Sequence, residues 1–136
     1  MMRQIKIGYI GGGSKSWARV FMMDLAYAEG LSGEIALYDI DVPAAQINKK
    51  IGERINQDPN AVSKWRYEVY ENIDDALVGS DFVVMSILPG TFEEMRSDVH
   101  TPEKFKIYQS VGDTVGPAGV IRNMRTVPMY EHFARK

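Results

Sequence analysis

The 136-residue sequence predicts an α/β fold, with a mostly parallel sheet and helices on both of its faces. Three observations lead to this class. Short runs rich in β-branched apolar residues alternate with helix-length segments along the chain. Three consecutive glycines follow the first of these runs, as in the turn from strand to helix of a βαβ unit. Residues 82–87 form a nearly continuous apolar run, which is typical of a strand covered on both faces.

The first predicted strand, residues 5–10, leads through the glycine turn into a helix over residues 17–29. Gly11 can take backbone angles that a side chain forbids, so the chain can turn sharply there. At Gly13 the missing Cβ would let a pyrophosphate approach the backbone. The free N–H groups of the first helical turn, with the positive end of the helix dipole, would hold its charge.

Ser16 and Asp39 also have expected roles in this βαβ unit. Ser16 replaces the third glycine of the usual pattern, and it is small enough for a close helix–strand contact and able to cap the helix. The second strand, residues 34–39, ends in Asp39. A carboxylate there accepts hydrogen bonds from an adenosine ribose and repels a 2′-phosphate, which favours NAD over NADP.

Two alternatives compete for the turn. A plain glycine loop without a ligand would use the same residues. A phosphate-binding loop of an NTPase would need a Lys directly after the second glycine. Gly8 and Gly13 have the required spacing, but Ser14 stands where that Lys must be and Lys15 comes one residue late, so the NTPase loop is rejected.

The first helix carries two apolar rows at helical spacing and is expected to be largely buried. The rows are Trp17, Val20, Phe21, Leu25 and Ala28, and then Ala18, Met22 and Ala26. Asp41 could cap the next helix, in which Ile47, Ile51 and Ile55 form one apolar stripe. A third strand over residues 66–70 and a short helix capped by Asn72 complete this part.

The fourth predicted strand, residues 81–87, ends at Leu88-Pro89-Gly90. Ligands of open parallel sheets lie outside the carboxyl ends of the strands, so Ile87 and Pro89 should line the cofactor. A plain turn is the alternative.

After this strand, Thr91 followed by two glutamates predicts a capped helix within residues 91–105. His100 there is expected to be a surface or capping residue. The loop 112–119 is rich in glycine, and Pro117 can open the helix that follows it. Asp113 and Thr114 in this loop could meet a polar substrate or could simply cap a turn. Arg122 and Arg125 are too few to predict an anion site.

Composition narrows the classes of function. A net charge of −2 gives no support for binding to nucleic acid or an anionic membrane. No apolar run approaches the ~20 residues of a membrane span, and the N-terminus lacks the apolar region of a signal peptide. Without cysteine there is no disulfide and no thiolate metal ligand. We therefore expect a cytoplasmic protein.

A length of 136 residues suits a single domain. With the βαβ unit described above, we expect one NAD-binding, Rossmann-like domain over residues 1–136. A doubly wound sheet has five or six strands, whereas only four are predicted here. We expect the fold to be incomplete at its C-terminus and the chain to be the front of a longer protein.

Several motifs resemble the NAD- and manganese-dependent family 4 glycosidases over essentially the whole chain. They are Ile10-Gly11-Gly12-Gly13-Ser14, Leu37-Tyr38-Asp39, residues 86–90 and residues 108–117. Residues 65–68 and 98–100 are similar to the branch of α-galacturonidases, near the α-glucosidases and α-galactosidases. The family usually shows a glycine where this chain has Ala118.

The resemblance implies an unusual glycosidase mechanism. NAD takes a hydride from C3 of the sugar, a base removes the C2 proton, the glycosidic oxygen leaves by elimination, and water and hydride are then added. A manganese or other divalent ion polarises the sugar oxygens, held by a Cys and a His beyond residue 136. The proposed base also lies downstream, so this chain should carry no catalytic residue and no metal ligand.

We therefore expect the NAD-binding part of a family 4-like glycosidase that is inactive as a fragment, with a small-molecule sugar substrate and a homo-oligomeric full-length form. The alternatives are a 2-hydroxy-acid dehydrogenase of the lactate or malate type and a non-enzymatic nucleotide-sensing module. The candidate cofactor-binding residues are Gly11, Gly13, Ser14, Lys15, Asp39, Ile87 and Pro89, and the substrate-proximal residues are Asp113 and Thr114.

Overall fold

The computed structural model describes residues 3–110 and 115–136. It divides into two compact units, Met1–Ile87 and Leu88–Lys136, which are described separately. The first unit contains the strands β1 (Arg3–Ile10), β2 (Leu31–Tyr38), β3 (Trp65–Tyr70) and β4 (Phe82–Met85), and the helices α1 (Trp17–Ala26), α2 (Val42–Ile55) and α3 (Ile73–Leu77). The second contains α4 (Phe92–His100), the 3₁₀ helix η1 (Thr101–Phe105) and α5 (Gly116–Ala134). The prediction of one domain over residues 1–136 stays a prediction.

The four described strands of the first unit form one parallel sheet in the order β3-β2-β1-β4. This is the order of the first four strands of a doubly wound sheet, the fold class that the sequence predicts. Because all four strands run the same way, their carboxyl ends lie along one edge. The residues that follow β1, β2 and β4 are therefore brought to that edge.

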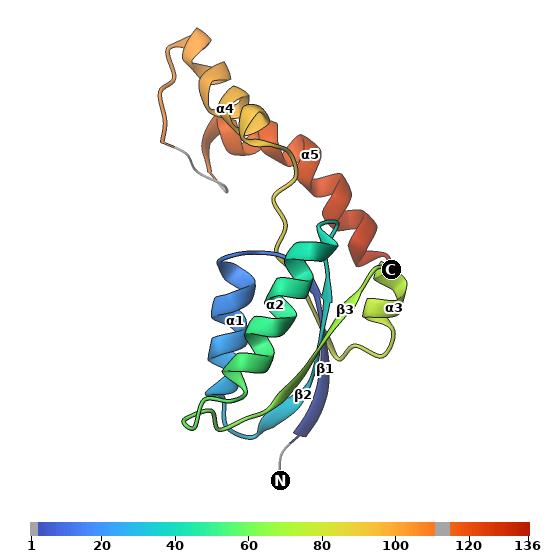
Figure 1. Ribbon diagram of the computed structural model, residues 1–136. Helices are drawn as coiled ribbons and strands as arrows, with labels where there is room; N and C mark the ends of the chain where they lie inside the picture. The colour runs from blue at the N-terminus through green and yellow to red at the C-terminus, as the bar shows by residue number, and fades with distance from the viewer. Residues whose placement is uncertain (1–2, 111–114) are drawn as a thin grey trace. The chain divides into compact units, whose positions relative to one another are not determined.

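Helices cover both faces of this sheet (Figure 1). On one face, α1 and α2 pack over inward side chains of β1, β2 and β3, among them Ile7, Ile35 and Tyr67. On the other face lies α3, where a Cβ at Gly8 of β1 would come within 2.9 Å of Leu77. The predicted arrangement of helices on both faces is therefore confirmed.

The burial of α1 and α2 differs from the prediction. In α1 the fully buried row is Ala18, Met22 and Ala26, whereas Trp17 is 72% exposed and Val20 is about half-exposed. In α2 Ile51 and Ile55 pack against the core, but Ile47 is half-exposed. The inner face of α2 consists of the small or polar residues Ala45, Asn48 and Gly52. The small residues among these let each helix approach its neighbours closely. Phe21 and Leu25 still pack against the core, whereas Trp17 and Val20 are turned toward solvent.

Three of the four predicted helix caps are confirmed. Asp41 Oδ1 accepts a hydrogen bond from the Ala44 N–H at 3.1 Å, and Asn72 Oδ1 accepts one from Asp74. Thr91 forms a capping box with Glu94 at the start of α4. Ser16 makes no capping bond; instead, Ser14 Oγ accepts the Trp17 N–H at 3.1 Å, because the glycine turn brings the Ser14 side chain to the start of the helix.

In the second unit, a buried carboxylate holds α4 to α5. Asp98 is almost fully buried and pairs with Arg125 through Oδ1 and Nη1 at 3.0 Å. The Arg122 Nε lies 3.8 Å from Asp98 Oδ2. An acid is seldom buried unless it is paired in this way. The two arginines, for which the sequence predicts no anion site, thus have a partner within the chain.

No helix among residues 3–110 and 115–136 combines the length and the apolar character that a membrane crossing requires.

Candidate functional site

The glycine turn after β1 has a conformation that strongly favours glycine. Gly11 has a φ of +97°, and a Cβ there would lie 2.1 Å from the carbonyl oxygen of Ser86. The N–H groups of Gly11 and Gly12 both donate to the Tyr38 carbonyl at 2.9 Å. The turn is therefore held against the ends of both neighbouring strands, β2 and β4.

Asp39 follows β2 and points into this turn. Its Oδ2 accepts a hydrogen bond from the Gly13 N–H at 2.7 Å, and its Oδ1 accepts one from the Asp41 N–H at 2.9 Å. These two bonds fix the carboxylate while it remains only partly buried. Each oxygen has a second lone pair with which to accept a hydroxyl of a ligand.

The structure assigns Gly13 a steric role that the sequence does not predict. A Cβ at Gly13 would lie 2.8 Å from Asp39 Oδ2 and 2.9 Å from Ala44 Cβ. The space left by the missing Cβ is thus taken by the carboxylate and by α2. Its proposed role, the close approach of a pyrophosphate, is a prediction that this geometry does not test.

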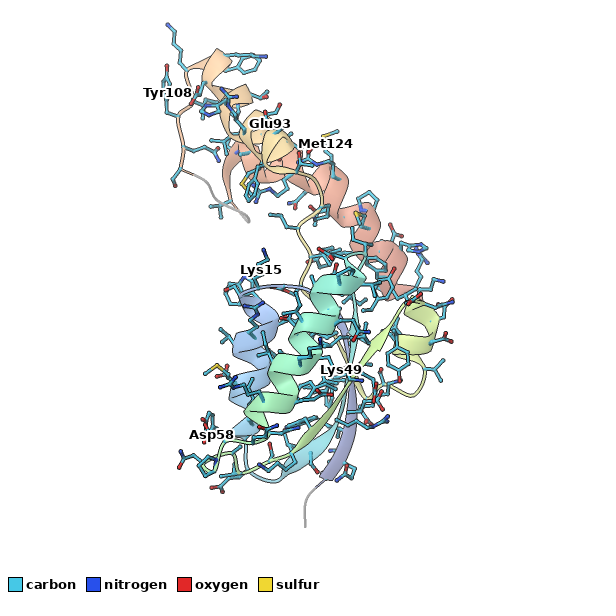
Figure 2. The ribbon with its side chains drawn as sticks, in the orientation of Figure 1. Lys15, Lys49, Asp58, Glu93, Tyr108 and Met124 are labelled. Atoms are coloured by element: carbon cyan, nitrogen blue, oxygen red, sulfur yellow. The ribbon has the colours of Figure 1, made fainter. Side chains whose placement is uncertain are left out.

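The N-terminal end of α1 presents unsatisfied donors. The N–H groups of Lys15, Ser16, Ala18 and Arg19 donate no hydrogen bond to any residue that the structure describes. Together with the positive end of the helix dipole, such groups form a site for an anion. The exposed Lys15 side chain extends from this same end (Figure 2) and adds a full positive charge.

Asn48 of α2 is a site residue that the sequence analysis missed. It is fully buried, and its Nδ2 donates to the carbonyls of Gly12 at 2.7 Å and Ser14 at 2.8 Å. Arg19 Nε in turn donates to Asn48 Oδ1 at 2.9 Å. The sequence held one signal for this role: Asn48 is an amide side chain on a helix face that otherwise carries small residues, Ala45 and Gly52.

Ile40 was also missed. It directly follows Asp39 and is 95% exposed, so its apolar side chain is open to a ligand bound beside that carboxylate. An apolar residue immediately after the acid that ends a strand was the signal in the sequence.

Of the other predicted site residues, only Ile87 has a described position beside the turn. Ile87 lies beside the turn, with its Cγ2 3.3 Å from the position that a Cβ of Gly11 would take. Pro89 belongs to the second unit, so its contact with a cofactor stays a prediction. Asp113 and Thr114 lie outside the described residues.

Within the described residues no group of three His, Cys, Asp or Glu side chains could share a metal ion. His100 is a surface residue, as predicted, with its Nδ1 2.9 Å from Glu103 Oε1. Three tyrosines of the sheet have raised pKa values, and for Tyr70 the main cause is its hydrogen bond to Glu34. Burial raises the pKa of Tyr9, against a smaller opposing effect of Ser86, and burial raises the pKa of Tyr67 to about 12. Both phenols therefore stay neutral at pH 7.

Comparison with known proteins gives concordant matches. The model of a family described as "Family 4 glycosyl hydrolase" matches residues 6–136. An α-galacturonidase of Thermoanaerobacter italicus is 57% identical over 97% of this chain. The chain spans only 28% of the length of that relative.

Solved structures agree with this result. The crystal structure of the Bacillus subtilis protein lplD has 52% identity and a TM-score of 0.85, with 97% of this chain and 29% of the other covered. A 6-phospho-beta glucosidase of Thermotoga maritima, solved with manganese, NAD+ and glucose-6-phosphate, has a TM-score of 0.78 at 22% identity, over 96% of this chain and 31% of the other. The latter likeness shows a shared fold. These matches favour the glycosidase family over the dehydrogenase alternative.

Proposed function

This chain belongs to family 4 of the glycosyl hydrolases, and we propose that it is the NAD-binding part of an α-galacturonidase. One observation carries the proposal: the Gly13 N–H holds the Asp39 carboxylate against the glycine turn at 2.7 Å, at the N-terminal end of α1. A carboxylate in this position is suited to the adenosine ribose of a dinucleotide.

The described residues suit the pyrophosphate and adenosine parts of such a ligand. The unsatisfied N–H groups of Lys15 and Ser16, aided by the Lys15 side chain, would hold the pyrophosphate. Asp39 would accept the ribose hydroxyls, and its negative charge would repel the 2′-phosphate of NADP. The exposed Ile40 offers an apolar surface for the adenine ring, and Ile87 lines the turn from β4.

The chemistry that NAD supplies when bound is the reversible removal of a hydride from a sugar carbon, which is the first step of the mechanism implied by the family. The residues described here bind and orient the cofactor. No step that involves a metal is assigned to them, because they offer no set of metal ligands. The manganese and NAD+ in the Thermotoga maritima structure support both cofactors for a full-length enzyme.

The proposed substrates are α-linked galacturonides, supported by the α-galacturonidase at 57% identity. The chain spans 28% of that relative, so we propose that hydrolysis requires the remainder of such an enzyme. Release of galacturonate from an α-galacturonide by residues 1–136 alone, with NAD and Mn²⁺, would contradict this part of the proposal.

Isothermal titration calorimetry of the chain with NAD and with NADP tests the cofactor assignment. We expect NAD to bind at least about tenfold more tightly than NADP, a difference of ~1.4 kcal/mol. Asp39→Asn keeps one carbonyl acceptor but removes the charge, so it should reduce the difference between the two cofactors. Absence of NAD binding by the folded chain, or equal affinity for NADP, would contradict the assignment.

A further inference from the structure

We propose that Asn48 is a positioning residue, which aims the backbone N–H groups of the glycine turn at the cofactor without touching it. The inference rests on the proposed NAD site and concerns two residues outside the family motifs, Asn48 on α2 and Arg19 on α1. Both are in the first unit, so the whole arrangement lies within one described body.

Asn48 holds two carbonyl groups of the glycine turn. Its side chain is fully buried, and its amide nitrogen donates both to the Gly12 carbonyl and to the Ser14 carbonyl. A buried amide of this kind is costly unless it is paired, and here each of its donors has a backbone partner. Two alternate peptide groups of the turn are thereby held by a single side chain.

The planarity of the peptide bond determines where the neighbouring N–H groups point. In a trans peptide the carbonyl of one residue and the N–H of the next point in opposite directions. Because Asn48 draws the Ser14 carbonyl inward, the Lys15 N–H must point outward, away from the Asn48 amide. Because it also draws the Gly12 carbonyl inward, the Gly13 N–H is directed the other way, and there it meets Asp39 Oδ2 at 2.7 Å.

The same contact affects the first turn of α1. The Ser14 carbonyl is the acceptor that the Ala18 N–H would take in a continued helix, and Asn48 occupies it instead. The Ala18 N–H therefore makes no hydrogen bond to the described residues, but Ala18 is fully buried, so the donors open to an anion are those of the exposed Lys15 and Ser16. A single amide thus influences the pyrophosphate donors and the ribose acceptor.

Arg19 determines which way the Asn48 amide faces. Its Nε donates to Asn48 Oδ1 at 2.9 Å, which places the oxygen toward Arg19 and leaves both hydrogens for the turn. With the amide reversed, its oxygen would face two carbonyl oxygens and no donor would reach them. Arg19 is only partly buried, so its substitution should disturb the fold less than that of Asn48.

The test compares Asn48→Leu with the matched control Asn56→Leu. Asn56, at the C-terminal end of α2, also bonds to backbone, through Nδ2 to the Trp65 carbonyl at 2.7 Å and through Oδ1 to the Trp65 N–H at 3.2 Å, away from the turn. NAD affinity is measured by calorimetry at a temperature where circular dichroism shows each variant folded. Both variants should melt earlier than the wild type.

We expect Asn48→Leu to weaken NAD at least about tenfold, and Asn56→Leu to weaken it less than about threefold. Arg19→Ala should lower NAD affinity about threefold to tenfold. If Asn48→Leu does not fold, the Arg19→Ala variant alone tests the proposal. Unchanged NAD affinity in Asn48→Leu and Arg19→Ala, or equal losses in Asn48→Leu and Asn56→Leu, would overturn the role of Asn48 alone. Absence of NAD binding by the folded wild type would overturn the proposed function together with this inference.

Discussion

At the scale of single residues, the candidate site depends on two glycines that are needed for different reasons. Gly11 needs its φ of +97°, and any Cβ there would meet the Ser86 carbonyl that follows β4. Gly13 needs space, because the Asp39 carboxylate and Ala44 occupy the volume that its side chain would fill. The positive φ of Gly11 gives the turn its shape, and the missing side chain of Gly13 lets the Asp39 carboxylate lie against the turn.

Gly11→Ala should lower the free energy of unfolding by more than about 3 kcal/mol, from backbone strain and collision with the Ser86 carbonyl together. Gly30→Ala is the matched control, since Gly30 also has a positive φ of +80° but no atom within 4 Å of the position that a Cβ would take. It should cost about 1 kcal/mol. Urea denaturation followed by circular dichroism measures both, and similar losses would contradict the close contact.

Tyr67 connects burial to the pH dependence of stability. Its hydroxyl is buried and has no hydrogen-bond partner among the described residues. Burial raises its pKa from 10.0 to about 12. The folded chain therefore keeps this proton to higher pH than the unfolded chain, so the stabilising contribution is intact below pH 10 and is lost as the pH rises toward 12.

Tyr67→Phe should reduce the fall in unfolding free energy between about pH 10 and pH 12 by about 2 kcal/mol relative to the wild type. At pH 7 it should be neutral or slightly stabilising, since it removes an unpaired buried hydroxyl. Denaturation curves at the three pH values give both quantities. An equally steep fall in both proteins would show that Tyr67 ionises in the folded state with an ordinary pKa.

At the scale of the element, residues at the start of α1 both cap the helix and leave N–H groups for a ligand. Ser14 caps the helix through its side chain, and its carbonyl is bound by Asn48. The N–H groups that follow are thereby left for a ligand. Helix ends with such free donors are disfavoured when buried, but here Lys15 and Ser16 are exposed.

Ser14→Ala should destabilise the chain by about 1 kcal/mol, the usual cost of losing an N-cap bond. Ser16→Ala should change stability by less than about 0.5 kcal/mol, because Ser16 makes no capping bond and is exposed. Thermal denaturation of the two variants shows whether Ser14 or Ser16 caps α1. A larger loss for Ser16→Ala would mean that the cap is formed by Ser16 after all.

The sequence predicts elements better than it predicts their orientation. Strands, the glycine turn and the Asp41, Asn72 and Thr91 caps follow from local patterns that need no distant partner. Helix α1 carries two apolar rows, and the sequence does not tell which of them meets the sheet. The structure places the smaller row inside, which is why Trp17 is exposed.

At the scale of the molecule, topology explains why residues far apart in sequence meet. In a parallel sheet the carboxyl ends of β1, β2 and β4 share one edge. The prediction that Asp39 and Ile87 line the cofactor therefore needed only the parallel direction of the strands. Asn48 and Arg19 could not be predicted in the same way. Their contacts depend on how α1 and α2 pack over the turn, which no local motif specifies.

A titration of the isotope-labelled chain with NAD, followed by ¹H–¹⁵N NMR, tests the central claim most directly. We predict that the largest amide shifts fall on Gly13 to Trp17 and on Asp39 and Ile40, because a dinucleotide would contact the first set through its pyrophosphate and the second through its adenosine. Shifts concentrated elsewhere in the folded chain, with these residues unchanged, would contradict the account.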